Sequence, residues 1–102
     1  MAVMVIAEVQ GQTESGYDGM FELLAGSLSR AEGFVLHTAY PVEGGWLITE
    51  VWQSKDAANR FFAKDVAPNL PPGVHPKRSV HELHDLLTPD VTRPAAGSDK
   101  PN

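Results

Sequence analysis

The sequence predicts an α+β fold in which a four-stranded antiparallel sheet carries two helices on one of its faces. Two observations lead to this fold. Several short segments are β-rich, and two other stretches have apolar residues that recur at steps of three and four. Together these segments follow the order β-α-β-β-α-β, a common two-layer arrangement. With 102 residues, 42% of them hydrophobic, the chain has the length of one domain with a modest core.

The first half of the chain supplies three strands and one helix. The helix has Thr13 as a plausible N-cap and Glu14 at its positive end. A polar turn precedes it, and the "PVEGG" connection joins the second strand to the third as a hairpin. The predicted bounds are strands at 2–10, 33–41 and 45–53 and a helix from Thr13 to about Leu28.

The second half begins with a helix that Ser54 caps, followed by a proline-rich loop that includes His75. The buried stripe of this helix contains Ala58, Phe61, Phe62 and Val66. Residues 77–87 fit either a last strand or a short helix, and the β-α-β-β-α-β order favours the strand. We therefore predict a domain over 1–87 and a flexible Pro/Ala/Gly/Ser-rich tail over 88–102.

Composition excludes several classes of function. The formal net charge of -5 and the scattered Lys and Arg residues argue against nucleic acid and anionic membrane as partners. With 0 cysteines, disulfides, Fe–S clusters and thiolate zinc sites are excluded. The first residues lack a basic leader, and their apolar run is short for a signal peptide or a membrane span, so a cytoplasmic protein is expected.

The stretch "GWLITEVWQS" (45–54) is apolar on both faces of its strand. Counting by twos places Glu50 on the same face as Trp46 and Trp52. Two helices cover only one face of the sheet, so we expect the other face to carry tryptophan and to meet a partner subunit or a ligand. The alternation alone leaves open which face holds Trp52 and Glu50.

The stretch "HTAYPVEGGWLITEVWQSKDAANRFF" resembles the antibiotic biosynthesis monooxygenase-like proteins. The residues that carry this resemblance are His37, "EGGW", "EVWQS", the Phe61–Phe62 pair and "LHDLL" at 83–87, and the resemblance covers roughly residues 2–87. It implies ferredoxin-like monomers that pair sheet against sheet as a dimeric α+β barrel, with a pocket between sheet and helices. The best-known members are cofactor-independent oxygenases of aromatic polyketides, and relatives degrade haem or act as isomerases, decarboxylases or cyclases.

Two departures from the family patterns bear on the activity. The haem-degrading members use an asparagine on the first strand, where this chain offers none, and this argues against haem degradation. The aromatic-polyketide oxygenases place an asparagine four residues before the strand-three tryptophan, where this chain has Ile48. This departure argues against direct transfer of that oxygenase mechanism.

Three residues are candidates for a catalytic base, in the order His37, His84 and Glu50. Both histidines match recurring family positions on strands, and histidine exchanges protons near neutral pH. Glu50 lies among aromatic side chains, which would raise its pKa toward a useful range; the alternative is an ion pair with Arg78 or Lys77. The alternative for each histidine, slightly favoured for any single one, is a hydrogen-bonded structural residue on its strand.

Four aromatic residues are candidates for substrate binding: Trp52, Trp46, Phe62 and Tyr17. Trp52 matches the pocket tryptophan of the family, although a place in the core or the dimer interface explains it equally well. Trp46 beside the hairpin also fits structural packing. No motif for a metal or a phosphate is present, because "HELH" lacks the zincin spacing and "EGGW" is a turn.

These observations predict a homodimeric, cofactor-independent enzyme for a small aromatic or polyketide-type substrate. Oxygenation is the first hypothesis, with isomerisation, cyclisation and decarboxylation as variants that use the same base. The alternative from another class is a non-catalytic homodimer that binds a small hydrophobic ligand. A cavity lined by His37, Trp52 and a carboxylate would favour the enzyme, and a space filled by apolar side chains would favour the alternative.

Overall fold

The computed structural model describes residues 1–89, and the predicted tail over 88–102 lies almost wholly outside them. The strands are β1 (Val3–Gln10), β2 (Phe34–Val42), β3 (Gly45–Trp52) and β4 (His75–Glu82). The helices are α1 (Glu14–Ser29) and α2 (Lys55–Phe61), and α2 continues into a π-helical turn over Phe62–Val66 and a 3-10 turn over Ala67–Asn69. No helix in the described range is long and apolar enough to cross a membrane.

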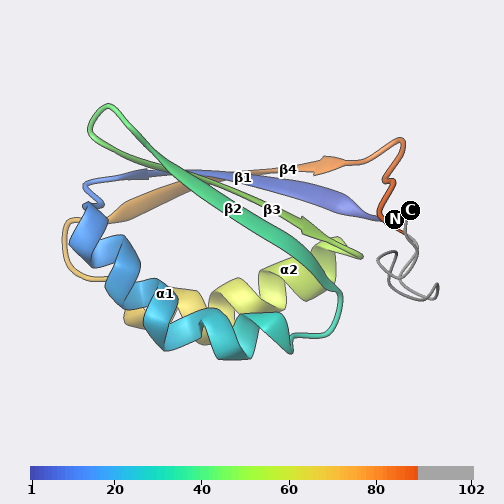
Figure 1. Cartoon of the computed structure of the whole chain (residues 1–102), viewed down its shortest axis with the longest axis horizontal. Helices are drawn as coiled ribbons and strands as arrows, with labels where there is room; N and C mark the ends of the chain where they lie inside the picture. Colours follow the sequence, from blue (N-terminus) through green and yellow to red (C-terminus); the bar gives the residue numbers. More distant parts are fainter. Residues whose placement is uncertain (90–102) are drawn as a thin grey trace, which may run out of the picture.

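The four strands form one antiparallel sheet in the order β2-β3-β1-β4. Both helices lie beneath the same face of this sheet (Figure 1). This confirms the predicted α+β, ferredoxin-like fold with β-α-β-β-α-β connectivity. Within residues 1–89, no helix lies over the opposite face of the sheet.

The two helices begin where the sequence predicts, because both caps form. The Thr13 hydroxyl accepts the Gly16 backbone N–H at 3.1 Å, and the Ser54 hydroxyl accepts the Ala57 N–H at 3.1 Å. Each cap satisfies a backbone donor that the first helical turn leaves free. The two caps therefore set where α1 and α2 begin.

The last strand differs from the prediction at both ends. It runs over 75–82 instead of 77–87, so His75 is its exposed first residue and His84 lies beyond its end. The physical reason is the length of its partner: β1 pairs residue by residue from Gln10 opposite His75 to Val3 opposite Glu82. One further hydrogen bond, from Leu83 N–H to the Ala2 carbonyl at 2.9 Å, ends the pairing.

The register of β1 against β3 decides which face holds the tryptophans. Val3 lies opposite Trp52 and Val5 opposite Glu50, and both valines are buried beneath the helices. Directly opposed residues share a face in an antiparallel pair, so Trp46, Glu50 and Trp52 all face the helices. The expectation that the uncovered face carries tryptophan is wrong. On β3 that face carries Leu47, Thr49 and Val51.

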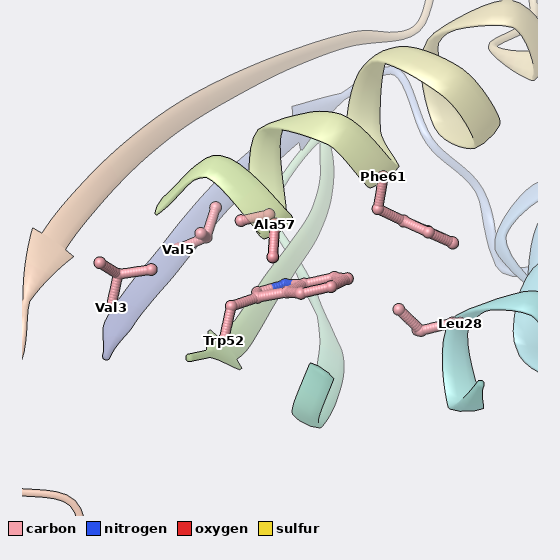
Figure 2. Packing of buried hydrophobic residues seen from close by; sticks show 7 residues of the cluster. Val3, Val5, Leu28, Trp52, Ala57 and Phe61 are labelled. Atoms are coloured by element: carbon pink, nitrogen blue, oxygen red, sulfur yellow. The ribbon is translucent and has the colours of Figure 1, made fainter. Parts of the chain in front are cut away.

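The main core lies at the end of the sheet where β1 begins and β3 ends. Trp52 is 1% exposed at its centre, and the other fully buried side chains of this cluster come from β1 and both helices (Figure 2). The Phe61 ring lies 5.7 Å from the Trp52 ring, centre to centre, and the Phe34 ring meets it edge-on at 5.5 Å. Burial of an aromatic ring of this size is a large contribution to the stability of a small domain.

Candidate active site

A cavity of about 110 Å³ lies between the sheet and the helices. Its wall is mostly apolar, with contributions from all four strands, from α1 and from α2 with its π-helical continuation. The polar lining residues are Gln12, Tyr17, His37, Glu50 and Arg78. A few polar groups in an apolar concavity are typical of a small-molecule site, although this volume is below the roughly 300–1,000 Å³ of drug-sized sites.

A continuous chain of hydrogen bonds runs along one wall of the cavity. The Tyr17 hydroxyl lies 2.7 Å from His37 Nε2, and His37 Nδ1 lies 2.7 Å from Glu50 Oε2. The Trp52 indole N–H donates to the other carboxylate oxygen, Glu50 Oε1, at 2.9 Å. The Glu50 carboxylate thus has one partner on each oxygen, one from the core and one at the cavity.

Local structure explains why these side chains meet. Tyr17 lies one helical turn after the cap, and its backbone N–H donates to the Thr13 carbonyl at 2.8 Å. His37 of β2 lies directly opposite Glu50 of β3 in the register. Glu50 and Trp52 are two residues apart on one strand and so share a face. A helix N-terminus and one hairpin therefore assemble the whole chain.

The direction of the hydrogen bonds follows from the groups involved. An ionised carboxylate only accepts, so the Glu50 carboxylate assigns the proton of neutral His37 to Nδ1. His37 Nε2 then accepts the Tyr17 O–H and is the basic nitrogen on the cavity side. Burial raises the pKa of the Tyr17 hydroxyl, and the negative charges of Glu50 and Asp18 raise it further. Tyr17 is therefore a protonated donor at neutral pH.

The Tyr17 ring is held between other aromatic rings. Trp46 stacks on it with the ring centres 4.9 Å apart and the planes 3° from parallel. Phe21 stacks on it as well, at 5.9 Å. The ring is thereby fixed with its hydroxyl toward His37, so Trp46 supports Tyr17 from outside the cavity and is absent from the cavity lining.

The structure brings four of the predicted site residues to the cavity: His37, Glu50, Tyr17 and Phe62. Trp52 does not line it, because the register buries its ring in the core instead of in the predicted cavity wall. His84 is also elsewhere: its side chain is 98% exposed, past the end of β4. It therefore does not reach the cavity as a second base.

The predicted alternative for Glu50, an ion pair with Arg78 or Lys77, differs from what is found. Among residues 1–89 the Glu50 carboxylate instead has the His37 imidazole at 2.7 Å, which is a hydrogen bond to neutral His37 and becomes an ion pair when His37 is protonated. Lys77 is exposed on the opposite face of the sheet, because it alternates with Arg78 along β4.

Sequence reasoning did not place two polar residues in the cavity: it left out Gln12 and considered Arg78 only as an ion-pair partner of Glu50. Gln12 follows β1 and is 9% exposed, with its side-chain oxygen accepting the Thr13 N–H at 3.1 Å. Arg78 faces the helices from β4, where it is two residues from Val80. The alternation of Pro76, Arg78 and Val80 with polar neighbours was the available signal, since it places Arg78 on the covered face.

The arrangement is suited to proton transfer. Glu50, His37 and Tyr17 are joined by hydrogen bonds at the edge of an apolar cavity. The Tyr17 end can pass a proton to the His37 imidazole, and the Glu50 carboxylate stabilises the imidazolium that results. In the described part of the chain, no group of three or more His, Cys, Asp or Glu side chains is arranged to hold a metal ion.

Comparison with solved structures identifies the fold, while neither a protein-family model nor a curated protein sequence matches the chain. SnoaB, a cofactor-independent oxygenase from Streptomyces nogalater, is 19% identical with a TM-score of 0.65, over 84% of this chain and 96% of that one. The haem-degrader MhuD from Mycobacterium tuberculosis, solved with two haems in its active site, is 16% identical with a TM-score of 0.58, over 84% and 99%.

A candidate antibiotic biosynthesis monooxygenase from Deinococcus radiodurans is also similar. It is 16% identical with a TM-score of 0.57, over 88% of this chain and 99% of that one. At these identities the likeness concerns the backbone, and proteins of one fold differ in chemistry. The chain therefore shares the ferredoxin-like fold of these solved structures.

Proposed function

We propose that this protein is a cofactor-independent enzyme that removes a proton from a small aromatic or polyketide-type substrate. The single observation that carries the proposal is the Glu50–His37–Tyr17 hydrogen-bond chain, which ends at an apolar cavity. The shared fold with SnoaB, a cofactor-independent oxygenase, supports oxygenation as the first reaction to test.

The proposed base is His37 acting through Tyr17. The substrate gives a proton to the Tyr17 oxygen while the Tyr17 proton passes to His37 Nε2, so the electron pair of the broken bond stays on the substrate as an anion. Glu50 stabilises the imidazolium that forms. Because the pKa of Tyr17 is raised, the tyrosine relays the proton instead of resting as a phenolate.

The substrate anion then reacts with molecular oxygen at carbon. For a methylene of the anthrone type, addition of oxygen and one proton gives a hydroperoxide, and loss of water leaves a carbonyl. The protein contributes orientation, exclusion of water and stabilisation of charge. An isomerase, cyclase or decarboxylase would use the same base without consuming oxygen.

A non-catalytic ligand-binding protein is the second candidate function. The small volume of the cavity, about 110 Å³, and its mostly apolar wall favour this candidate. In both cases we propose that the protein acts as a homodimer through the uncovered face of the sheet.

The test is oxygen consumption with an anthrone as the substrate. We expect turnover by the wild type and a loss of about 10²–10⁴-fold in His37→Ala, the usual contribution of a general base. Tyr17→Phe should lose a comparable factor if the tyrosine relays the proton, and Glu50→Gln should reduce turnover less.

The matched control is His84→Ala. The His84 side chain is 98% exposed past the end of β4 and does not line the cavity, so its removal should leave turnover unchanged. Equal turnover in His37→Ala and the wild type would remove the proposed base. Product formation without oxygen uptake would identify one of the other reactions, and binding without any product would favour the ligand-binding protein.

A further inference from the structure

Arg78 is a cation in the wall of the cavity that the proton-transfer chain does not use. It lies opposite Ala7 in the register, on the face of β4 that the helices cover. Its guanidinium carbon is 4.3 Å from the centre of the Phe62 ring, and it donates to the Asn59 side-chain oxygen at 3.3 Å. These two contacts hold the side chain against the π-helical continuation of α2.

The charge of Arg78 has no carboxylate partner in the described structure. Within residues 1–89, neither of the two ion pairs involves Arg78. Glu50 is the acid whose charge acts on the pKa of Arg78, but its two oxygens already have His37 and Trp52 as hydrogen-bond partners. A guanidinium has five N–H donors, and the bond to Asn59 uses one of them.

Burial makes this position unfavourable for a cation. It lowers the pKa of Arg78, and the charge of Glu50 offsets only part of the effect. Arginine nevertheless remains charged in proteins, and a partly buried charge is destabilising unless it is paired. The free donors of its planar fork match a carboxylate, which they can bind with two parallel hydrogen bonds.

We propose that Arg78 binds a carboxylate group of the substrate, so that the natural substrates are aromatic acids. This proposal rests on the proposed function in one respect: the substrate loses its proton at the Tyr17 side of the cavity. Neighbouring strands lie about 4.8 Å apart, and β1 separates β3 from β4. Glu50 lies opposite Val5 and Arg78 opposite Ala7, so their backbones are about 10 Å apart across the sheet and offset by about 7 Å along it.

The apolar surface between the two groups fits an aromatic ring. Val5 and Ala7 of β1 line the cavity floor between the base and the cation. A substrate that lies on them directs its acidic hydroxyl or carbon toward Tyr17 and its carboxylate toward Arg78. The anion made by proton removal forms at the Tyr17 end, so a permanent carboxylate is the better match for Arg78.

Binding of matched acids and amides tests this inference without any turnover. The probes are meta-hydroxybenzoate and a hydroxynaphthoate, each compared with its own carboxamide, which has nearly the same shape and no charge. We expect the wild type to bind each acid about tenfold or more tightly than its amide, the usual gain from a charge-assisted bond. In an NMR titration the Arg78 side-chain N–H signal should shift with the acids alone.

Three variants assign the preference to Arg78. Arg78→Gln should abolish the difference between acid and amide, and Arg78→Lys should retain part of it because the charge remains. Arg60→Gln removes the same kind of side chain from the exposed surface of α2 and should leave the difference unchanged. The wild-type comparison stands even if Arg78→Gln fails to fold.

Two results would overturn the inference: equal binding of acid and amide by the wild type, or a preference that survives in Arg78→Gln. Absence of binding by both members of each pair would also count against it. If the acids bind through Arg78 but no substrate is turned over, the proposed function fails and the carboxylate site stands. If neutral phenols are turned over with no preference for acids, the proposed function stands and the carboxylate site fails.

Discussion

At the scale of single residues, Glu50 connects the hydrophobic core to the cavity. Its Oε1 accepts the N–H of Trp52, a side chain that is 1% exposed, and its Oε2 meets His37. A buried indole cannot move without disturbing its packing, so the core fixes the carboxylate and the carboxylate fixes the imidazole. This explains why Glu50 lies between two tryptophans in the sequence. Trp52 positions its carboxylate, and Trp46 supports Tyr17, which belongs to the same series of hydrogen bonds.

Tyr17 gives a prediction in alkaline solution. Burial, Glu50 and Asp18 raise its pKa above the ordinary value of 10.0, so the folded state holds this proton more tightly than the unfolded state. The sign follows: the contribution of Tyr17 to stability is fully present below about pH 10, the ordinary pKa of tyrosine, and is lost as the pH rises through the folded pKa. Urea unfolding followed across this range measures the loss.

Two variants separate Tyr17 from the other titrating groups. Tyr17→Phe should flatten the part of the alkaline stability profile that belongs to this hydroxyl. Glu50→Gln should lower the pKa of Tyr17 toward its ordinary value, because a source of negative charge is removed. An ultraviolet titration in which Tyr17 ionises no later than in an unfolded peptide would contradict the prediction.

At the scale of elements, a bulge in β2 allows both Phe34 and His37 to face the helices. Phe34 and His37 are three apart, which would place them on opposite faces of a regular strand. The register shifts between Phe34 and Leu36, so that Phe34 lies opposite Trp52 and His37 opposite Glu50. One extra residue at this bulge therefore serves the core and the site together.

The sequence was sufficient to predict the positions of the helices and strands, but not which face of each strand the helices cover. Caps at Thr13 and Ser54 and the hairpin turn are local signals, and the structure has each helix and hairpin where these signals place it. The burial of Trp52 could not be read from alternation, because β3 is apolar on both sides. The bulge, the end of β4 and the position of Arg78 all depend on pairing between strands, which no single segment encodes.

The cap of α1 gives a prediction at this scale. Thr13→Ala removes the acceptor of the Gly16 N–H and should lower the free energy of unfolding by about 1 kcal/mol. Chemical denaturation measures this change. Thr13→Asn is the matched control, because asparagine is an equally good cap and should retain most of the stability. Equal loss in both variants would mean that the hydroxyl contact has no capping role.

At the scale of the whole molecule, the two faces of the sheet differ in what covers them. The helices cover one face, whereas the other carries apolar side chains from three strands. In the single chain, Leu36 is 38% exposed and Tyr40 is 54% exposed, and their partners on β3 are Val51 and Leu47. Apolar surface of this kind on a small domain is typical of an interface.

The last prediction is that this face joins two copies of the chain. Light scattering after size-exclusion chromatography should give about twice the 11.0 kDa of one chain. Leu36→Asp should shift the protein toward the monomer, because two charges would meet in a desolvated interface. Leu23→Asp is the control, since Leu23 is 60% exposed on α1, away from this face. A wild type that remains monomeric at micromolar concentration would contradict the paired-sheet arrangement and leave the cavity of each chain to function alone.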